Sequence, residues 1–243
     1  MARSCPMTPS LQDLPDRPLL VAVHGWLLAG RLWDPLARAL EPDWQLWSPD
    51  LPGFGTTERP RGLQPSLASY GRWLAEAVVE RAPNRPVVLV GHSLGGSVVL
   101  HAAAHLGPQL KGVVQVASGG GVYQPKAFAQ VRRAGSIFLQ WRPSWLQSLP
   151  FTDAMRSPLG ADLRAARGLL ACSTNRGAVR QLPQITAALQ VPSLWIAGSR
   201  DQVMQPGYVP DHRIVVLEGV GHLAMRECPE LLASTMGSWL KGC

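Results

Sequence analysis

The 243-residue chain lacks several features that would place it in a specialised class. It contains no apolar run of about 18 residues, so the sequence predicts no membrane span. Its first six residues, Met1 to Pro6, have no apolar signal core, which favours a cytoplasmic location over secretion. Its four cysteines, at positions 5, 172, 228 and 243, have neither metal-site nor disulfide-framework spacing. We therefore expect incidental, reduced thiols.

Motifs for phosphate and nucleic acid binding are also missing. The glycine run at residues 118–121 lacks the lysine that a phosphate-binding loop needs. No DNA- or RNA-binding motif accompanies the excess of basic residues, so we expect no nucleic acid partner. With 46% hydrophobic residues, the chain is long enough for one large α/β domain with a full core.

The most informative stretch present is residues 87–96, which read VVLVGHSLGG. The β-branched run predicts a strand, the residues that follow predict a helix, and Ser93 lies at the sharp turn between them, as a G-x-S-x-G nucleophile motif requires. Gly91 and Gly95 leave room around the tight turn. The start of the helix favours developing negative charge, because its N–H groups are free. Ser93 is the candidate nucleophile.

A nucleophilic serine needs a base, and the base needs a group that orients it. His222, just past the last predicted strand, is the candidate base. Asp201, at the carboxyl end of the preceding predicted strand, is the candidate acid. Asp50 also follows a strand, but its proline- and glycine-rich surroundings favour a role in loop structure. Asp211 is a weaker alternative in a loop.

The chain order serine, aspartate, histidine is that of α/β-hydrolases and differs from the orders in chymotrypsin-like and subtilisin-like proteases. Four signatures carry the resemblance from Leu19 to about Leu240: His24-Gly25-Trp26, DLPGFG at residues 50–55, GHSLGG at residues 91–96, and Gly221-His222 with Asp201 ahead of it. The chain resembles the α/β-hydrolases, and among them the small capped serine esterases, such as the carboxylesterases of pimeloyl-acyl-carrier-protein methyl ester.

This resemblance implies the remaining parts of a catalytic site. The backbone N–H groups of Trp26 and Leu94 would form the oxyanion hole, where donors aimed at the developing charge supply much of the catalysis. His24 would shape the oxyanion loop through local hydrogen bonds and take no proton from Ser93. The reaction would need no metal and no other cofactor.

The pattern of elements predicts an α/β-hydrolase fold with a mostly parallel sheet of about six to seven strands flanked by helices. We expect strands at residues 19–24, 44–49, 86–91, 112–117, 193–198 and 213–218, and helices at residues 31–40, 66–82, 96–106 and 229–240. Residues 1–17 leave room for one short extra strand at most. The predicted organisation is a core at residues 1–121 and 190–243 with an inserted helical cap at residues 122–189.

The predicted cap carries the net charge of the chain, +7. Between Val122 and Arg180 it has nine basic residues and two acidic ones, Asp153 and Asp162. A basic cap over a neutral core suggests an acidic carrier protein or an anionic membrane surface as partner. The alternative is a solvated cap face in a chain that prefers arginine.

The cap also contains large apolar residues that could line an acyl pocket, dip into a membrane interface or simply pack in the core. The candidate substrate-binding residues are Trp26, Phe138, Trp141, Trp145, Arg132 and Arg142.

The leading hypothesis is a serine hydrolase that cleaves a small-molecule carboxylic ester through an acyl-enzyme. One alternative is a lyase like the menaquinone-pathway succinyl-hydroxycyclohexadiene carboxylate synthase, in which the same triad acts as a base and cap arginines bind carboxylates. Another is a lipid- or chlorophyll-directed esterase at a membrane surface. The scaffold alone does not decide between them, because it hosts many chemistries.

Overall fold

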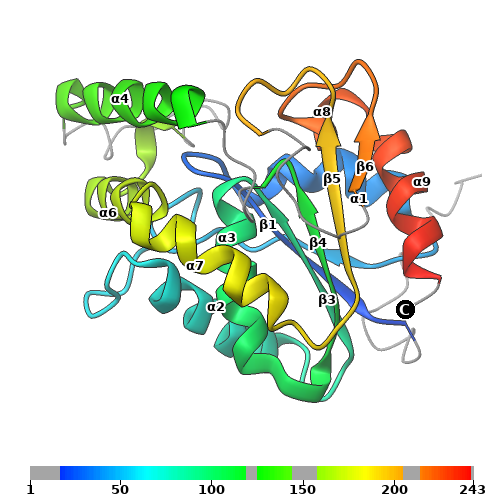
Figure 1. The fold of residues 1–243 in the computed structure, drawn as a ribbon. Coiled ribbons are helices and arrows are strands. Elements are labelled where there is room, and N and C mark those ends of the chain that lie inside the picture. The colour runs from blue at the N-terminus through cyan, green and yellow to red at the C-terminus, as the bar shows by residue number, and fades with distance from the viewer. Residues whose placement is uncertain (1–16, 119–124, 144–157, 205–213, 242–243) are drawn as a thin grey trace, which may run out of the picture.

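The computed structural model describes residues 17–118, 125–143, 158–204 and 214–241 (Figure 1). Its strands are β1 (Leu19–Val23), β2 (Leu46–Trp47), β3 (Val87–His92), β4 (Leu110–Val116), β5 (Ser193–Gly198) and β6 (Ile214–Leu217). Its helices are α1 (Asp34–Leu40), α2 (Leu67–Arg81), α3 (Leu94–Leu106), α4 (Pro125–Trp141), α6 (Leu163–Ser173), α7 (Arg176–Ala187), α8 (Ala224–Glu227) and α9 (Pro229–Leu240). Short 3₁₀ helices occur at Gly30–Trp33 and Gly107–Gln109.

The six strands form one parallel sheet in the order β2-β1-β3-β4-β5-β6. This confirms the predicted fold class, and every predicted strand has a counterpart. Strand β2 is shorter than predicted, since only residues 46 and 47 pair with β1 at the edge of the sheet. The strand considered at residues 1–17 falls almost wholly outside the described residues.

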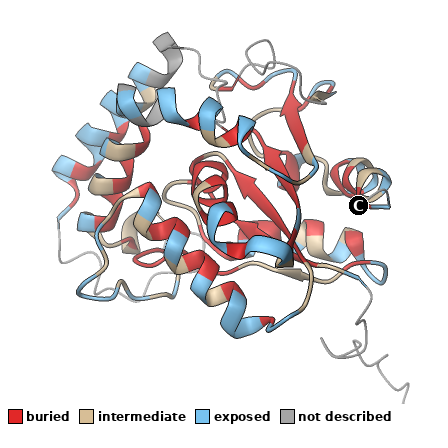
Figure 2. Ribbon diagram, turned by 60° about the horizontal axis from the view of Figure 1, so that its bottom comes forward, coloured by how far each residue is buried: buried red, intermediate tan, exposed pale blue. Residues whose placement is uncertain are grey.

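The alternation of side chains along the strands builds two apolar clusters, one on each face of the sheet. In β1, Leu19 and Val21 face the cluster that contains α2 and α3, whereas Leu20 and Ala22 face the cluster that contains α1 and α9. Figure 2 shows the result, with buried strands at the centre and exposed outer faces on the helices. Both faces are covered, as a parallel sheet requires.

The segment predicted as a helical cap contains α4, α6 and α7 in its described part (Figure 1). Helices α4 and α6 contact each other above one end of the sheet, whereas α7 packs against α3. Leu182 of α7 is fully buried in the same cluster as α2 and α3. Helix α7 therefore covers the sheet, and the helices over the site are α4 and α6. The division of the chain at residues 122 and 189 remains a prediction.

Within the described residues, no helix has the length and apolar character needed to cross a bilayer.

Candidate active site

Ser93 occupies the turn between the central strand β3 and helix α3. Its backbone has φ 52° and ψ −119°, which is a strained conformation for a residue with a side chain. The turn is possible because its neighbours are small: a Cβ at Gly91 would lie 2.5 Å from the Cα of Gly96, and a Cβ at Gly95 would lie 2.4 Å from the carbonyl oxygen of Val23. The structure thus places the Ser93 hydroxyl at the apex of a tight strand-to-helix turn.

His222 and Asp201 lie close together at the carboxyl ends of the strands, because each follows the end of a strand in the parallel sheet. The Nδ1 atom of His222 lies 2.8 Å from Oδ2 of Asp201. The other carboxylate oxygen of Asp201 accepts hydrogen bonds from the backbone N–H groups of Val203 and Met204, at 2.8 and 3.1 Å. Burial alone would raise the pKa of Asp201, but its hydrogen bond with His222, the charge of His222 and the two N–H donors outweigh burial and lower that pKa. Asp201 is therefore held as a carboxylate that orients the His222 ring.

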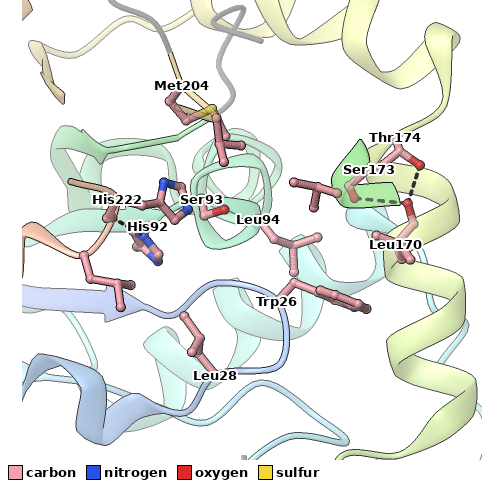
Figure 3. A pocket seen from close by; sticks show the side chains of 13 residues that line it. Trp26, Leu28, His92, Ser93, Leu94, Leu170, Ser173, Thr174, Met204 and His222 are labelled. Atoms are coloured by element: carbon pink, nitrogen blue, oxygen red, sulfur yellow. Dashed lines mark hydrogen bonds between the residues drawn. The ribbon is translucent and has the colours of Figure 1, made fainter. Parts of the chain in front are cut away.

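The imidazole of His222 lies beside the Ser93 side chain, and both line one pocket (Figure 3). Among the described residues, no hydrogen bond joins the Ser93 hydroxyl to His222. Such contacts are commonly long before substrate binds, so the arrangement is compatible with proton transfer from serine to histidine.

His92, the residue before Ser93, supports the His222 backbone. Its Nε2 lies 3.0 Å from the carbonyl oxygen of His222, so this nitrogen carries the proton and donates. The two rings are 4.8 Å apart between centroids. Burial, followed by the nearby positive charge of His222, lowers the pKa of His92 to about 3. His92 is therefore a neutral, buried residue that holds the candidate base in place.

Trp26 and Leu94, the predicted oxyanion donors, both line the pocket with Ser93. Leu94 is the first residue of α3, so its N–H has no partner within its own helix. The Trp26 indole Nε1–H donates to the carbonyl oxygen of Ala166 in α6, at 2.9 Å. The ring also lies under α4, where a Cβ at Gly135 would come within 2.6 Å of it. Trp26 therefore links the loop after β1 to both α4 and α6.

His24 and Asp50 have the structural surroundings expected of loop residues. Nδ1 of the buried His24 lies 2.8 Å from the carbonyl oxygen of Gly25, and its Nε2 accepts from the N–H of Leu51 at 2.9 Å. Burial is the largest influence on its pKa, which is lowered. Asp50 accepts from the N–H of Gly30 at 2.6 Å and from the N–H and hydroxyl of Thr56 at 2.7 and 3.0 Å. Both side chains tie loops together next to the site.

The pocket over Ser93 has a volume of about 380 Å³ and a mostly apolar wall. Its lining consists of Trp26, Leu28, His92, Ser93, Leu94, Val131, Leu170, Ser173, Thr174, Val203, Met204, His222 and Leu223. The volume is near the lower end of the range for small-molecule sites, which suits one extended acyl group. In the described residues, no cluster of histidine, cysteine or acidic side chains could hold a metal ion.

Two aromatic residues predicted to bind substrate do not reach this pocket. Gly135 and Leu139 of α4, with Arg142 directly after the helix, form one buried stripe. Phe138 and Trp141 each precede a residue of that stripe by one position, about 100° around the helix. Phe138 is 38% exposed and Trp141 is 79% exposed. Trp145 lies outside the described residues.

The two predicted substrate-binding arginines also lie elsewhere. Arg132 is exposed and lines a separate groove between α4 and α6. Arg142 is buried, and its guanidinium donates to the carbonyl oxygens of Pro158, Leu159 and Ala161. Because those donors are used on the backbone, Arg142 ties the end of α4 to the segment before α6 and does not point into the pocket.

Several pocket residues were not anticipated. The apolar residues Ala166, Leu169 and Leu170 of α6 have helical spacing, and Ser173 continues that spacing, which could have indicated that it shares a face with buried residues. Val203 and Met204 directly follow the candidate acid, so their position was foreseeable once Asp201 was placed.

Comparison with known proteins agrees with this architecture. Residues 20–235 match the Alpha/beta hydrolase family. The chain is 31% identical over 216 residues to a pimeloyl-[acyl-carrier protein] methyl ester esterase of Xylella fastidiosa (strain M12), which covers 77% of each chain. It is 31% identical over 234 residues to the protein of the same name from Xanthomonas axonopodis pv. citri (strain 306), covering 84% of this chain and 88% of the relative.

Among solved structures, a thermophilic esterase from Thermogutta terrifontis superimposes with a TM-score of 0.73 at 21% identity, covering 93% of this chain and 90% of the other. At that identity the likeness concerns the fold.

Proposed function

The chain belongs to the alpha/beta hydrolase family, and we propose that it is a serine esterase that cleaves a carboxylic ester through an acyl-enzyme. The observation that carries the proposal is the placement of Ser93 at a strained turn beside His222, whose other ring nitrogen bonds Asp201 at 2.8 Å. These are the relations that a nucleophile, a base and an orienting acid need.

The proposed reaction uses only residues of this chain. The Ser93 oxygen attacks the ester carbonyl while His222 takes its proton, and the N–H groups of Trp26 and Leu94 stabilise the oxyanion. His222 then returns the proton to the leaving alcohol as the tetrahedral intermediate collapses to the acyl-enzyme. Water, deprotonated by His222, attacks the acyl carbonyl and releases the carboxylic acid and free Ser93. Asp201 stabilises the histidinium that forms in each half-reaction.

The finer proposal for the substrate is the methyl ester of an acyl group attached to an acyl carrier protein. Two relatives at 31% identity carry a name with this substrate. The apolar pocket of about 380 Å³ fits a short to medium acyl chain.

The outer face of α4 suits the acidic carrier in this proposal. It exposes Arg133 together with Ile137, Phe138 and Trp141, and the exposed Arg132 lies on the side of α4 that faces α6. A basic surface with aromatic side chains is suited to an acidic protein partner.

Acidic side chains near α4 do not neutralise this positive charge in the described residues. Asp162 is the only acidic residue in the described cap segments, and it pairs with Arg59 of the core at 3.1 Å. The exposed arginines of α4 therefore keep their positive potential.

The lyase alternative receives less support from the pocket. Binding substrate carboxylates would require cationic side chains, and the pocket wall built from described residues contains no arginine or lysine. The apolar wall favours a neutral ester.

The test compares hydrolysis of one methyl ester in two forms, free in solution and attached to acyl carrier protein. In parallel, pyruvate release from the substrate of the lyase alternative is assayed. We expect hydrolysis of both esters and a lower KM for the carrier-bound one. Arg133→Glu should raise KM for the carrier-bound ester and leave the free ester unchanged. Arg81→Glu, an exposed position at the C-terminal end of α2 and outside both α4 and the pocket, should change neither. Pyruvate release without ester hydrolysis would contradict the proposal.

A further inference from the structure

Among the described residues that line the pocket, Ser173 has a hydroxyl that the proposed reaction does not use and whose only internal hydrogen bond is long, at 3.4 Å. Ser173 ends helix α6 and is 7% exposed, in a wall that is otherwise mostly apolar. Figure 3 shows it across the pocket from Ser93, with the Leu94 side chain between them. A substrate acyl chain that leaves Ser93 along this pocket therefore approaches Ser173 with its far end.

The nearest acceptor for the Ser173 proton is already occupied. The carbonyl oxygen of Leu170 accepts from the hydroxyl of Thr174 at 2.6 Å and from the backbone N–H of Thr174 at 3.2 Å. A carbonyl oxygen has two lone pairs, so Thr174 uses both. The Ser173 hydroxyl lies 3.4 Å from the same oxygen, beyond the usual O–H···O range of about 2.5–3.0 Å.

A buried hydroxyl in this position favours a particular ligand chemistry. Its proton needs an acceptor, and leaving a buried polar group unmatched costs free energy. A carboxylate at the same place would be a charge buried in an apolar wall without a cation, which is unfavourable. A neutral carbonyl oxygen meets the requirement without that cost.

We propose that Ser173 is a specificity-determining residue whose hydroxyl donates a hydrogen bond to a neutral carbonyl, of an ester or thioester, at the far end of the substrate acyl chain. This role would let the pocket recognise the second carbonyl of the carrier-bound methyl ester already proposed, in which one end of the acyl group is an ester and the other a thioester. This inference rests on the proposed esterase function, because Ser93 must hold the first ester for Ser173 to reach the second carbonyl.

The experiment uses dimethyl esters of dicarboxylic acids from glutarate to azelate. Plain methyl alkanoates of equal chain length and the corresponding monomethyl half-acids are the comparison substrates, and acid release is followed by titration. At one chain length, kcat/KM for the diester should exceed that for the plain ester about 2- to 12-fold, after correction for its two equivalent ends, which is the range of one neutral hydrogen bond. The half-acid should be the poorest substrate.

Ser173→Ala should lower the ratio of kcat/KM for the diester to kcat/KM for the plain ester to about 1, because it removes the proposed hydrogen-bond donor. Ser136→Ala removes an exposed hydroxyl of α4 and should keep the preference, so it is the matched control. A merely structural role of Ser173 would lower kcat/KM on both esters equally. Equal rates on diester and plain ester at every length, or equal behaviour of the two variants, would overturn the inference and leave the esterase function standing. Hydrolysis of neither ester would overturn both.

Discussion

Replacing each of the two candidate aspartates by asparagine separates catalysis from loop structure. In Asp201→Asn, the amide oxygen can still accept from Val203 and Met204, which leaves the amide NH₂ facing His222. Nδ1 of His222 must then be an acceptor, so its proton moves to Nε2. The lone pair that should take the Ser93 proton is lost, although the geometry is kept.

The expected loss in kcat for Asp201→Asn is about 10³- to 10⁴-fold, the size found when a triad aspartate is replaced in this way. That corresponds to about 4–5.5 kcal/mol of transition-state stabilisation. The melting temperature should change little, because the backbone hydrogen bonds to the side chain remain.

Asp50→Asn should behave in the opposite way. Both carboxylate oxygens of Asp50 accept hydrogen bonds, from Gly30 and from Thr56, so an NH₂ group at either position removes at least one bond to the charged group. We expect a loss of about 1.5–3 kcal/mol in the free energy of unfolding. For a chain of this size the melting temperature should fall by about 3–12 °C, with kcat nearly intact.

The assay measures kcat on p-nitrophenyl butyrate and the melting temperature of each variant. A large catalytic loss in a stable Asp50→Asn protein, or near-normal kcat in Asp201→Asn, would refute the assignment of the acid.

Three further predictions concern residues around the site. The pKa of His92 is about 3 in the folded protein against 6.5 normally, so between about pH 6.5 and pH 3 the unfolded chain binds a proton that the folded chain does not, and stability should fall by about 1.4 kcal/mol for each pH unit as the pH is lowered through that window. His92→Gln, which keeps an N–H donor, should reduce this slope in urea unfolding at several pH values, and an unchanged slope would contradict the role of burial. Trp26→Phe, which removes the hydrogen bond to Ala166, should lower the free energy of unfolding by about 0.5–1.5 kcal/mol in the same assay; no loss would argue that this contact is not stabilising. Gly95→Ala places a Cβ 2.4 Å from a carbonyl oxygen and should destabilise the fold by about 1–3 kcal/mol or more, whereas Gly237→Ala, in open space on α9, should stabilise it by about 0.4–1 kcal/mol. Equal melting temperatures for the two glycine variants would be the contrary result.

The core of the fold and the residues at strand ends were accessible from the sequence because their signals are local. Alternating or continuous apolar runs identify the strands, and in a parallel sheet all carboxyl ends lie at one edge. Ser93, Asp201 and His222 each follow a strand that could be recognised, so their meeting at that edge could be anticipated. The strained turn at Ser93 was also predictable, because glycines on both sides of a serine, between a strand and a helix, indicate a turn too tight for neighbouring side chains.

The packing of α4 and α6 was less accessible from the sequence, because these helices contact partners far away along the chain. The apolar residues of α4 do not all face inward: Leu139 is buried, while Phe138 beside it is exposed. Arg142 illustrates the same limit, since its burial depends on backbone carbonyls 16 to 19 residues further along the chain. That Ser173 lines the pocket could be recognised only from the position of α6 in the structure.

If Ser93 becomes acylated during turnover, mass spectrometry of enzyme quenched during hydrolysis of a slow ester should detect the acyl-enzyme. We expect an added mass equal to the acyl group on the peptide that contains Ser93. We expect no adduct in Ser93→Ala, whose kcat should fall by a factor on the order of 10⁴ or more while the fold remains intact. An adduct on another residue, or a Ser93→Ala protein with most of its esterase activity, would show that Ser93 is not the nucleophile.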